Sequence, residues 1–316
     1  IYTSASIGIT LFPEDSEDDQ ELVKFADMAM YSAKNRKGNQ FSFFQQDMNL
    51  KLHRQKEISS DIRNALESDN FHLVFQPQVN AKSLRISGLE ALIRWEHEGV
   101  LVPPQDFLPI AEQNGLMPLI GEWALRNACL NALKWTHSEQ PITLAVNVSA
   151  AQFHQSDLTA SVQKILQETN FPPERLELEI TESLLMQNQD SAVQTMNQLN
   201  QLGVKLSIDD FGTGYSSLSY LKRFPVHKIK VDQSFIKDLE NDEDDAAIAL
   251  AIIQLGHTLG MTVVAEGVES EAQLKLLQKM GCDTIQGYYF SKPIGETDVA
   301  SWIDNADIGY NEIEMV

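Results

Sequence analysis

The residues that could carry chemistry in this chain stand where predicted strands end, and most of them are acidic. They are Glu90, Asn147, Glu179, Asp209 with Asp210, Lys230, Glu266 and Gln286. Five carboxylates and an amide oxygen gathered at one rim would repel one another strongly if left unpaired. Such oxygens are the ligands that magnesium and manganese prefer, whereas the two cysteines and seven histidines show no zinc-type spacing. The pattern therefore predicts a site for hard divalent cations.

The adjacent pair Asp209 and Asp210 is the most specific part of this pattern. Neighbouring residues on a straight strand point to opposite faces, so both aspartates can reach one site only where the strand breaks. The segment Phe211-Gly212-Thr213-Gly214 supplies such a break. One aspartate could then bridge two metal ions while the other holds one of them. For any one acid taken alone, a helix N-cap or a solvated loop is the competing interpretation.

Apolar runs of strand length alternate with helical segments from Phe71 onward. The predicted strands are Leu73–Val79, Ile86–Trp95, Thr143–Val148, Leu176–Thr181, Lys205–Asp209, His227–Val231, Thr262–Ala265 and Thr284–Tyr289. Eight strands over roughly 250 residues suit a (β/α)8 barrel, whose active site lies at the carboxyl ends of the strands. An open doubly wound sheet is the alternative with the same rhythm.

The gap between the first two strands refines this prediction. Only the segment from Asn80 to Arg85 separates them, which suits a hairpin and cannot hold a crossover helix. We therefore expect an α/β fold, a modified TIM (β/α)8 barrel with an antiparallel first strand, plus a small N-terminal α+β fragment.

The N-terminal fragment has a different pattern. Ser4–Phe12 is a predicted strand, Gln20–Asn35 a helix and Gln40–Phe44 a second strand, which together bury too little area to fold alone. A further helical pattern over about 47–67 connects this fragment to the barrel. The expected organisation is a fragment at residues 1–46, a linker helix at 47–62 and a barrel domain at 63–316.

Several motifs, in order along the chain, resemble those of EAL domains, a family of bacterial cyclic di-GMP phosphodiesterases. They are Glu90-Ala91-Leu92-Ile93-Arg94-Trp95, Asn147-Val148-Ser149, Glu179-Ile180-Thr181-Glu182, Asp209-Asp210-Phe211-Gly212-Thr213-Gly214-Tyr215-Ser216-Ser217-Leu218, Ile229-Lys230-Val231-Asp232, Ala265-Glu266-Gly267-Val268-Glu269 and Gln286-Gly287-Tyr288. The resemblance covers residues from about 63 to 305. It implies metal-dependent hydrolysis of cyclic di-GMP to linear pGpG, which lowers this second messenger in bacterial signalling.

The resemblance also implies a role for each matching residue. The first metal ion would be held by Glu90, Asn147, Glu179 and Asp209, and the second would be served by Asp209, Asp210 and Glu266. The expected catalytic residues are Lys230, which would position the attacking water, together with Glu266 and Glu90. The expected substrate-binding residues are Gln76, Pro77, Arg94, Gln286 and Pro293, with Arg94 on a phosphate and Gln76, Pro77 and Pro293 near a guanine. Glu269 would anchor the loop that follows Asp210.

The ligand set indicates how such a site would work. Two magnesium or manganese ions would lower the pKa of a shared water and stabilise charge on the phosphate, so no side-chain nucleophile is needed. Calcium is larger and prefers six to eight ligands, and we expect it to inhibit.

The first 46 residues resemble the end of a GGDEF domain, the domain that makes cyclic di-GMP. The matching segments are Thr3-Ser4-Ala5-Ser6-Ile7-Gly8-Ile9 and Ala26-Asp27-Met28-Ala29-Met30-Tyr31-Ser32-Ala33-Lys34. The Gly-Gly-Asp-Glu-Phe motif is absent from this chain, so cyclase activity is not expected of it. The first residues are typical of the middle of a domain, which favours a longer parent protein.

Net charge and hydropathy limit the kinds of partner that this chain is expected to contact. A formal net charge of −21 disfavours DNA or RNA as a partner. No run of eighteen apolar residues occurs, so no membrane contact is expected within this chain. Two cysteines without metal spacing fit a cytoplasmic location, with any membrane anchor lying upstream. The resemblance is compatible with a homodimer through the EAL domain.

Two other functions compete with the phosphodiesterase. One is a catalytically silent receptor domain that binds cyclic di-GMP, and the other is a purely structural interaction domain. A silent receptor usually lacks metal ligands, and every expected ligand position is filled here.

Overall fold

The computed structural model of the chain describes residues 5–35, 39–46, 48, 58, 61–68, 70–135, 142–155, 157–186, 188–214 and 218–306. The chain divides into two units. One comprises residues 1–67 with 109–114, and the other comprises residues 68–108 with 115–316. Within the described ranges, no helix is long and apolar enough to cross a membrane.

The first unit contains the predicted strand, helix and strand. They are β1 (Ser6–Ile9), α1 (Asp19–Asn35) and β2 (Gln40–Phe43), with β1 and β2 paired in parallel. Helix α1 starts after Asp18, whose Oδ1 accepts the backbone N–H of Gln20 at 2.8 Å, as an N-cap does. Gly8 lets β1 approach α1 closely, because a Cβ there would lie 1.9 Å from the carbonyl oxygen of Ala26.

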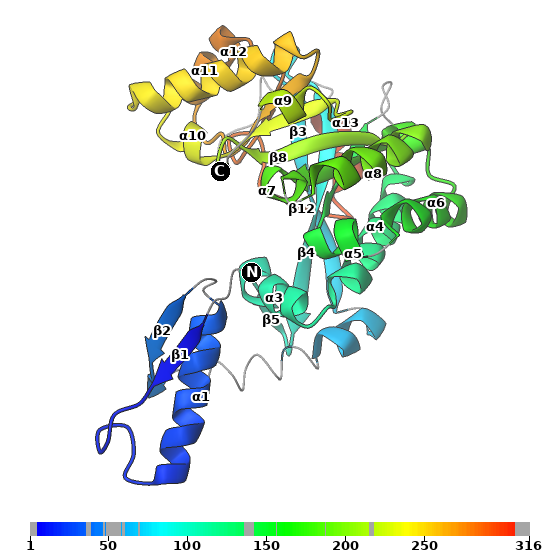
Figure 1. The fold of residues 1–316 in the computed structure, drawn as a ribbon. Helices are drawn as coiled ribbons and strands as arrows, with labels where there is room; N and C mark the ends of the chain where they lie inside the picture. Colours follow the sequence, from blue (N-terminus) through cyan, green and yellow to red (C-terminus); the bar gives the residue numbers. More distant parts are fainter. Residues whose placement is uncertain are drawn as a thin grey trace. The chain divides into compact units, whose positions relative to one another are not determined.

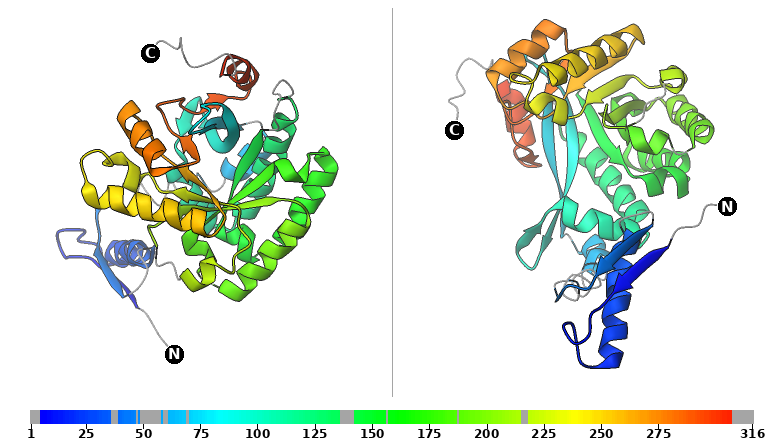
Figure 2. Two further views of the ribbon diagram at one scale, coloured as in Figure 1. Left: turned by 90° about the horizontal axis from the view of Figure 1, so that it is seen from above. Right: turned by 60° about the vertical axis from the view of Figure 1, so that its left-hand side comes forward.

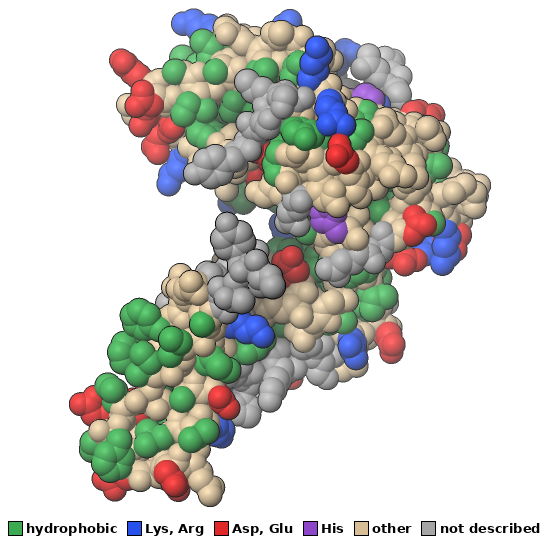
Figure 3. Space-filling model, viewed as in Figure 1, with side chains coloured by type: hydrophobic (Ala, Val, Ile, Leu, Met, Phe, Trp, Pro, Cys, Tyr) green, Lys and Arg blue, Asp and Glu red, His purple; other side chains and the backbone are tan. Residues whose placement is uncertain are grey.

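Helix α1 covers only one face of this two-stranded sheet. The side chains of the other face are therefore exposed, with Ile7 at 55%, Phe41 at 60% and Phe43 at 48%. Figure 3 shows apolar side chains gathered over these elements. Residues 61–67 are helical, and most of the remainder of the helix predicted over 47–67 lies outside the described residues.

The second unit is a closed barrel, which confirms the predicted fold and excludes the open doubly wound sheet (Figures 1 and 2). Eight strands of the described chain close it in the order β3-β4-β6-β7-β8-β9-β10-β11, and β11 pairs with β3. Their bounds are Phe71–Asn80, Ile86–His97, Thr143–Val148, Leu176–Thr181, Lys205–Phe211, Lys228–Val231, Thr262–Ala265 and Thr284–Gln286. The short strands β5 (Val100–Val102) and β12 (Ile294–Gly295), which the sequence pattern did not predict, pair with β4 and β3.

Strand β3 is antiparallel to both of its neighbours, as the short gap after it predicted. The hairpin to β4 is closed by the backbone N–H of Asn80, which donates to the carbonyl of Arg85 at 2.8 Å. Because β3 is reversed, its first residue, Phe71, pairs with Trp95 near the carboxyl end of β4. The first half of β3 therefore lies at the rim where the other barrel strands end.

Helices surround the strands, as the view from above shows (Figure 2, left). The longer ones are α3 (Pro104–Gln113), α4 (Met117–Ala132), α6 (Leu158–Thr169), α8 (Gln189–Gln201), α11 (Glu243–Thr258), α12 (Glu271–Met280) and α13 (Val299–Ala306). Four short helices, α5 (Ala150–Gln155), α7 (Glu182–Leu185), α9 (Leu218–Leu221) and α10 (Ser234–Lys237), also occur in the described ranges.

The alternation of side chains along each strand separates an apolar shell from a polar barrel interior. The residues that join the hydrophobic core with the helices include Leu178, Ile180, Leu206, Ile208, Ile229 and Val231. The residues between them on the same strands are polar and include Glu177, Glu179, Ser207, Asp209, Lys228 and Lys230. The barrel interior therefore holds buried charge, and the packing of the shell keeps it in place.

Candidate active site

Lys230 of β9 lies at the centre of the polar interior. Its Nζ is 2.6 Å from Glu266 Oε1, 2.7 Å from Glu179 Oε2, 3.1 Å from Asp209 Oδ1 and 3.4 Å from Glu90 Oε2. Burial alone lowers the pKa of a lysine, but these four carboxylates raise the pKa of Lys230 well above its usual value. Lys230 therefore stays charged and pairs with several acids at once, although its side chain is only 1% exposed.

Glu90 of β4 is held by an amide on each carboxylate oxygen. Asn147 Nδ2 donates to Oε1 at 2.6 Å, and Gln286 Nε2 donates to Oε2 at 2.6 Å. Burial raises the pKa of Glu90, but Lys230 and these two hydrogen bonds together hold it below the ordinary value. Because Asn147 contacts Glu90 through Nδ2, its amide oxygen Oδ1 is not used in this hydrogen bond.

Asp209, Asp210 and Glu266 form a second acidic group, in which one ligand oxygen from each lies within 4.8 Å of the others. Asp210 has a φ of 54°, and the pairing of β8 with β9 shifts register between Ile208 and Phe211. This break lets two adjacent aspartates reach one site. Burial, then Asp209 and neighbouring Asp232, raises the pKa of Asp210 to about 6. Burial also raises the pKa of Glu266 to about 8, even though Lys230 opposes the rise.

The donor set fits divalent cations. Glu179 is buried, and its Oε1 has no hydrogen-bond partner among the described residues. Burial, followed by repulsion from Glu90, raises its pKa well above the ordinary value. When ionised, the carboxylates around the Lys230 ammonium carry more negative charge than it can balance, and hard cations bound by oxygen would relieve this excess.

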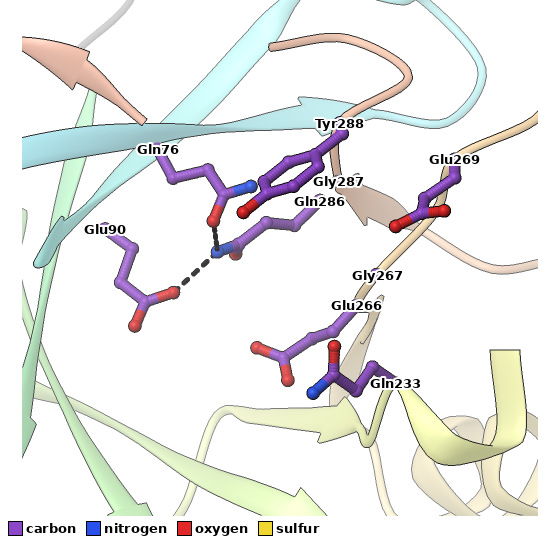
Figure 4. Close-up of a pocket in the computed structure, with 9 residues that line it drawn as sticks. All are labelled: Gln76, Glu90, Gln233, Glu266, Gly267, Glu269, Gln286, Gly287 and Tyr288. Atoms are coloured by element: carbon purple, nitrogen blue, oxygen red, sulfur yellow. Dashed lines mark hydrogen bonds between the residues drawn. The ribbon is translucent and has the colours of Figure 1, made fainter. Parts of the chain in front are cut away.

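A cavity of about 250 Å³ opens beside this cluster (Figure 4). It is lined by Gln76, Glu90, Gln233, Glu266, Gly267, Glu269, Gln286, Gly287 and Tyr288. Figure 4 shows Glu90 and Gln76 joined through the Gln286 amide, whose Nε2 donates to both. Predicted metal-binding, catalytic and substrate-binding residues therefore meet at one cavity.

The other predicted substrate contacts lie outside the lining of this cavity. Pro77 follows Gln76 on β3, so its side chain points to the opposite face of the strand. Arg94 lies further along β4 than Glu90 and is half-buried, with Nη1 donating to its neighbouring carbonyl, that of Ile93, at 2.8 Å. Pro293 immediately precedes β12, which pairs with β3 at Phe75.

The structure adds residues to which the sequence assigned no role. Glu182, at the start of α7, accepts the backbone N–H of Gly212 through Oε2 at 3.0 Å, and so ties the loop after Asp210 to the end of β7. Gln233 lies against Gly267, which has a φ of 70° and whose added Cβ would come within 2.6 Å of the Gln233 Cβ. The acid three residues after Glu179 was the available signal for Glu182. The anchoring role expected of Glu269 stays a prediction, because residues 215–217 of that loop lie outside the described part.

The family model described as EAL domain matches residues 59–293, well over half of the chain. The chain belongs to the EAL domain family. The model for the diguanylate cyclase GGDEF domain matches residues 1–40, so a short GGDEF fragment precedes the EAL domain.

Relatives of this EAL domain include named signalling proteins. The chain is 45% identical over 298 residues to the bifunctional diguanylate cyclase/cyclic di-GMP phosphodiesterase MucR of Pseudomonas aeruginosa, covering 93% of this chain and 43% of the relative. It is 43% identical over 295 residues to the signaling protein YkoW of Bacillus subtilis, covering 93% of this chain and 37% of the relative. The chain thus spans less than half the length of these two curated relatives.

A solved structure resembles the EAL domain closely. The PaMucR phosphodiesterase in complex with c-di-GMP is 44% identical and has a TM-score of 0.74, with 77% of this chain and 99% of that chain covered. The likeness therefore extends over the whole barrel of that protein.

Proposed function

We propose that this EAL domain hydrolyses cyclic di-GMP to linear pGpG with the help of divalent cations. The observation that carries the proposal is the buried group of four carboxylates around Lys230, which opens onto a cavity. The likeness to a phosphodiesterase solved with c-di-GMP supports the choice of substrate.

Two groups of side chains would hold the cations. The first comprises Glu90, Asn147, Glu179 and Asp209, and the second comprises Asp209, Asp210 and Glu266, with Asp209 shared between them. When bound, magnesium or manganese would supply a lowered pKa for a nearby water and a counter-charge for the phosphate. Calcium is the expected inhibitor, because it favours more ligands and longer distances.

The protein's own residues would orient the reactants. Water adds its oxygen to phosphorus, the bond from phosphorus to a ribose 3′ oxygen breaks, and that oxygen takes up a proton. The ammonium of Lys230 can donate a hydrogen bond to the attacking water, and Glu266, which must be ionised to serve a cation, can accept a hydrogen bond from that water. No side chain needs to form a covalent intermediate.

Substrate recognition would use the rim around the cavity. The planar guanidinium of Arg94 suits a phosphate, because its donors match two oxygens at once. Gln76 lines the cavity, and the proposed guanine lies beside it, close to the Pro77 backbone and to Pro293, which precedes β12. Gln286 would steady the metal–water network through its contact with Glu90.

A direct assay tests the proposal. The protein is incubated with cyclic di-GMP and magnesium, and pGpG is sought by chromatography, with Glu90→Ala as the inactive control. Formation of pGpG by the wild type alone supports a phosphodiesterase. Tight binding without any product would instead favour the silent receptor, and neither binding nor product would favour a structural domain.

Three further expectations belong with this function. The domain boundaries at residues 46 and 62 are tested by limited proteolysis. A homodimer through the EAL domain is tested by light scattering on the purified chain. The cytoplasmic location of the domain is tested by fusing it to a reporter that is active only in the cytoplasm.

A further inference from the structure

A second layer of polar side chains lies inside the barrel, further from the catalytic rim than the carboxylate cluster. Glu177 and Lys228 precede Glu179 and Lys230 by two residues on β7 and β9, so they point to the same interior. Lys228 Nζ lies 2.8 Å from Glu177 Oε1, and their side chains are 13% and 2% exposed. The proposed metal site uses none of these deeper residues.

Gln78 of β3 connects this deeper layer to the site. Lys228 Nζ donates to Gln78 Oε1 at 3.2 Å, and Gln78 Nε2 donates to Gln286 Oε1 at 3.0 Å. Gln286 Nε2 in turn donates to Glu90 Oε2 at 2.6 Å. An unbroken series of donors therefore runs from Lys228 through two buried amides to Glu90.

The chemistry of the two ends fixes the direction of this series. An ammonium can only donate hydrogen bonds, and an ionised carboxylate can only accept them. Each glutamine between them has one accepting oxygen and one donating nitrogen, of nearly the same size. If either amide were turned over, oxygen would face oxygen or nitrogen would face the ammonium. A single orientation of both amides satisfies every contact.

The space for Gln78 is built into the fold. Gln78 is 1% exposed and pairs with Gly88 across the β3–β4 ladder. A Cβ at Gly88 would come within 3.0 Å of Gln78 Oε1, so the missing side chain leaves room for the amide beside Lys228. The segment that contributes Glu90 thus also accommodates Gln78.

We propose that Lys228 and Gln78 are positioning residues, which orient the Gln286 amide so that it holds Glu90 ready to bind metal. The inference rests on the proposed function, because it concerns the metal-binding role of Glu90. The competing interpretation is that Lys228 only neutralises buried Glu177 and that Gln78 only fills space. Under that interpretation, replacing the Gln78 amide leaves the magnesium affinity unchanged.

Four variants separate the two interpretations. Gln78→Met keeps the length of the side chain but removes both hydrogen bonds to it. Gln78→Glu keeps the shape but presents an acceptor to Gln286, whose amide must then turn its oxygen toward Glu90. Glu177→Gln removes the ion pair and leaves Lys228 bonded to Gln78. Thr284→Val is the matched control, because Thr284 is buried on β11 two residues before Gln286 and belongs to neither interaction.

The measurement is magnesium affinity by calorimetry on the metal-free full chain, with the thermal midpoint recorded for each variant. Both Gln78 variants should bind magnesium about 10-fold more weakly than the wild type, as loss of a supporting hydrogen bond does. Glu177→Gln and Thr284→Val should stay within about two-fold, even where their thermal midpoints fall. Turnover of Gln78→Met should recover at saturating magnesium, because every direct ligand remains.

Wild-type affinity in both Gln78 variants would overturn the proposal, and so would a loss of affinity that follows the thermal midpoint across all four. A wild-type protein that binds no magnesium would instead refute the proposed function itself. The two failures are therefore distinguishable.

Discussion

Replacing Lys230 with methionine removes a cation that four buried carboxylates share. The ammonium lies within 3.4 Å of each, and the least buried of these side chains, that of Glu266, is 18% exposed. Removing one partner from a buried ion pair costs about 3–5 kcal/mol, because the remaining charge is unpaired and poorly solvated. We expect Lys230→Met to lower the free energy of unfolding by about this amount in the absence of metal.

The loss should depend on pH, with a sign that follows from the raised pKa values. Glu266 has a pKa of about 8 in the folded protein against an ordinary 4.5, so the folded state binds more protons than the unfolded state between these values. Its contribution to stability is complete below about pH 4.5 and is lost as the pH rises through about 8. Without Lys230 its pKa rises further, and each extra proton steepens the loss by about 1.4 kcal/mol per pH unit.

Urea unfolding in EDTA, at about pH 6 and about pH 8, measures both effects. The gap between Lys230→Met and wild type should be wider at the higher pH, and magnesium should narrow it by replacing the lost positive charge. Turnover of the variant in saturating magnesium should nevertheless stay about 100-fold below wild type, because no ammonium orients the water. Equal stability in EDTA would refute the charge argument, and full recovery of turnover would refute the catalytic role.

Other predictions concern the metal ligands and the loop after Asp210. Glu90→Ala should lower turnover by about 100-fold or more while the thermal midpoint is maintained, and a near wild-type rate would show that Glu90 is no ligand. Magnesium affinity should rise from pH 6 to pH 8, because Asp210 and Glu266, with pKa values of about 6 and about 8, must release protons when the metal binds. Calorimetry in buffers of different ionisation enthalpy measures this proton release. Binding without proton release would contradict the pKa values. Glu182→Gln should weaken magnesium binding about 10-fold by loosening the contact with Gly212. The same titration of Glu269→Ala tests the predicted second anchor of the loop, and an unchanged magnesium affinity would show that Glu269 does not anchor it. Calcium should support binding of cyclic di-GMP without turnover, and sustained turnover in calcium would contradict the expected geometry.

The fold was largely predictable because strand periodicity and gap lengths are local properties of the sequence. The short gap between Asn80 and Arg85 left no alternative to a hairpin, and the reversed first strand follows from it. The gathering of acids was predictable as well, since parallel strands bring their carboxyl ends to one rim. Strands β5 and β12 were not predicted, because they have three and two residues and too little alternation to detect.

The connections within the site were beyond prediction from residue types. That Lys230 reaches four acids depends on the barrel's radius and register, which pairing of distant strands sets. The contact between Glu182 and Gly212 depends on the positive φ of Asp210, because that residue turns the loop back toward β7. The deeper pair of Lys228 and Glu177 resembles any alternating polar residue of a strand until its partner is known.

The reversal of β3 also decides how the barrel is joined to the chain before it. In a barrel whose first strand runs with the others, the preceding chain enters at the face opposite the catalytic loops. Here β3 begins at the catalytic rim, where the Asn70 carbonyl accepts the backbone N–H of Glu96 at 2.9 Å and Phe71 pairs with Trp95. A pull or twist on the preceding chain would therefore act first on β3, which carries Gln76 and pairs with the strand that carries Glu90 and Arg94. The preceding chain thus enters the barrel at its catalytic end, so a movement of that chain would reach the strands around the substrate cavity before the rest of the barrel.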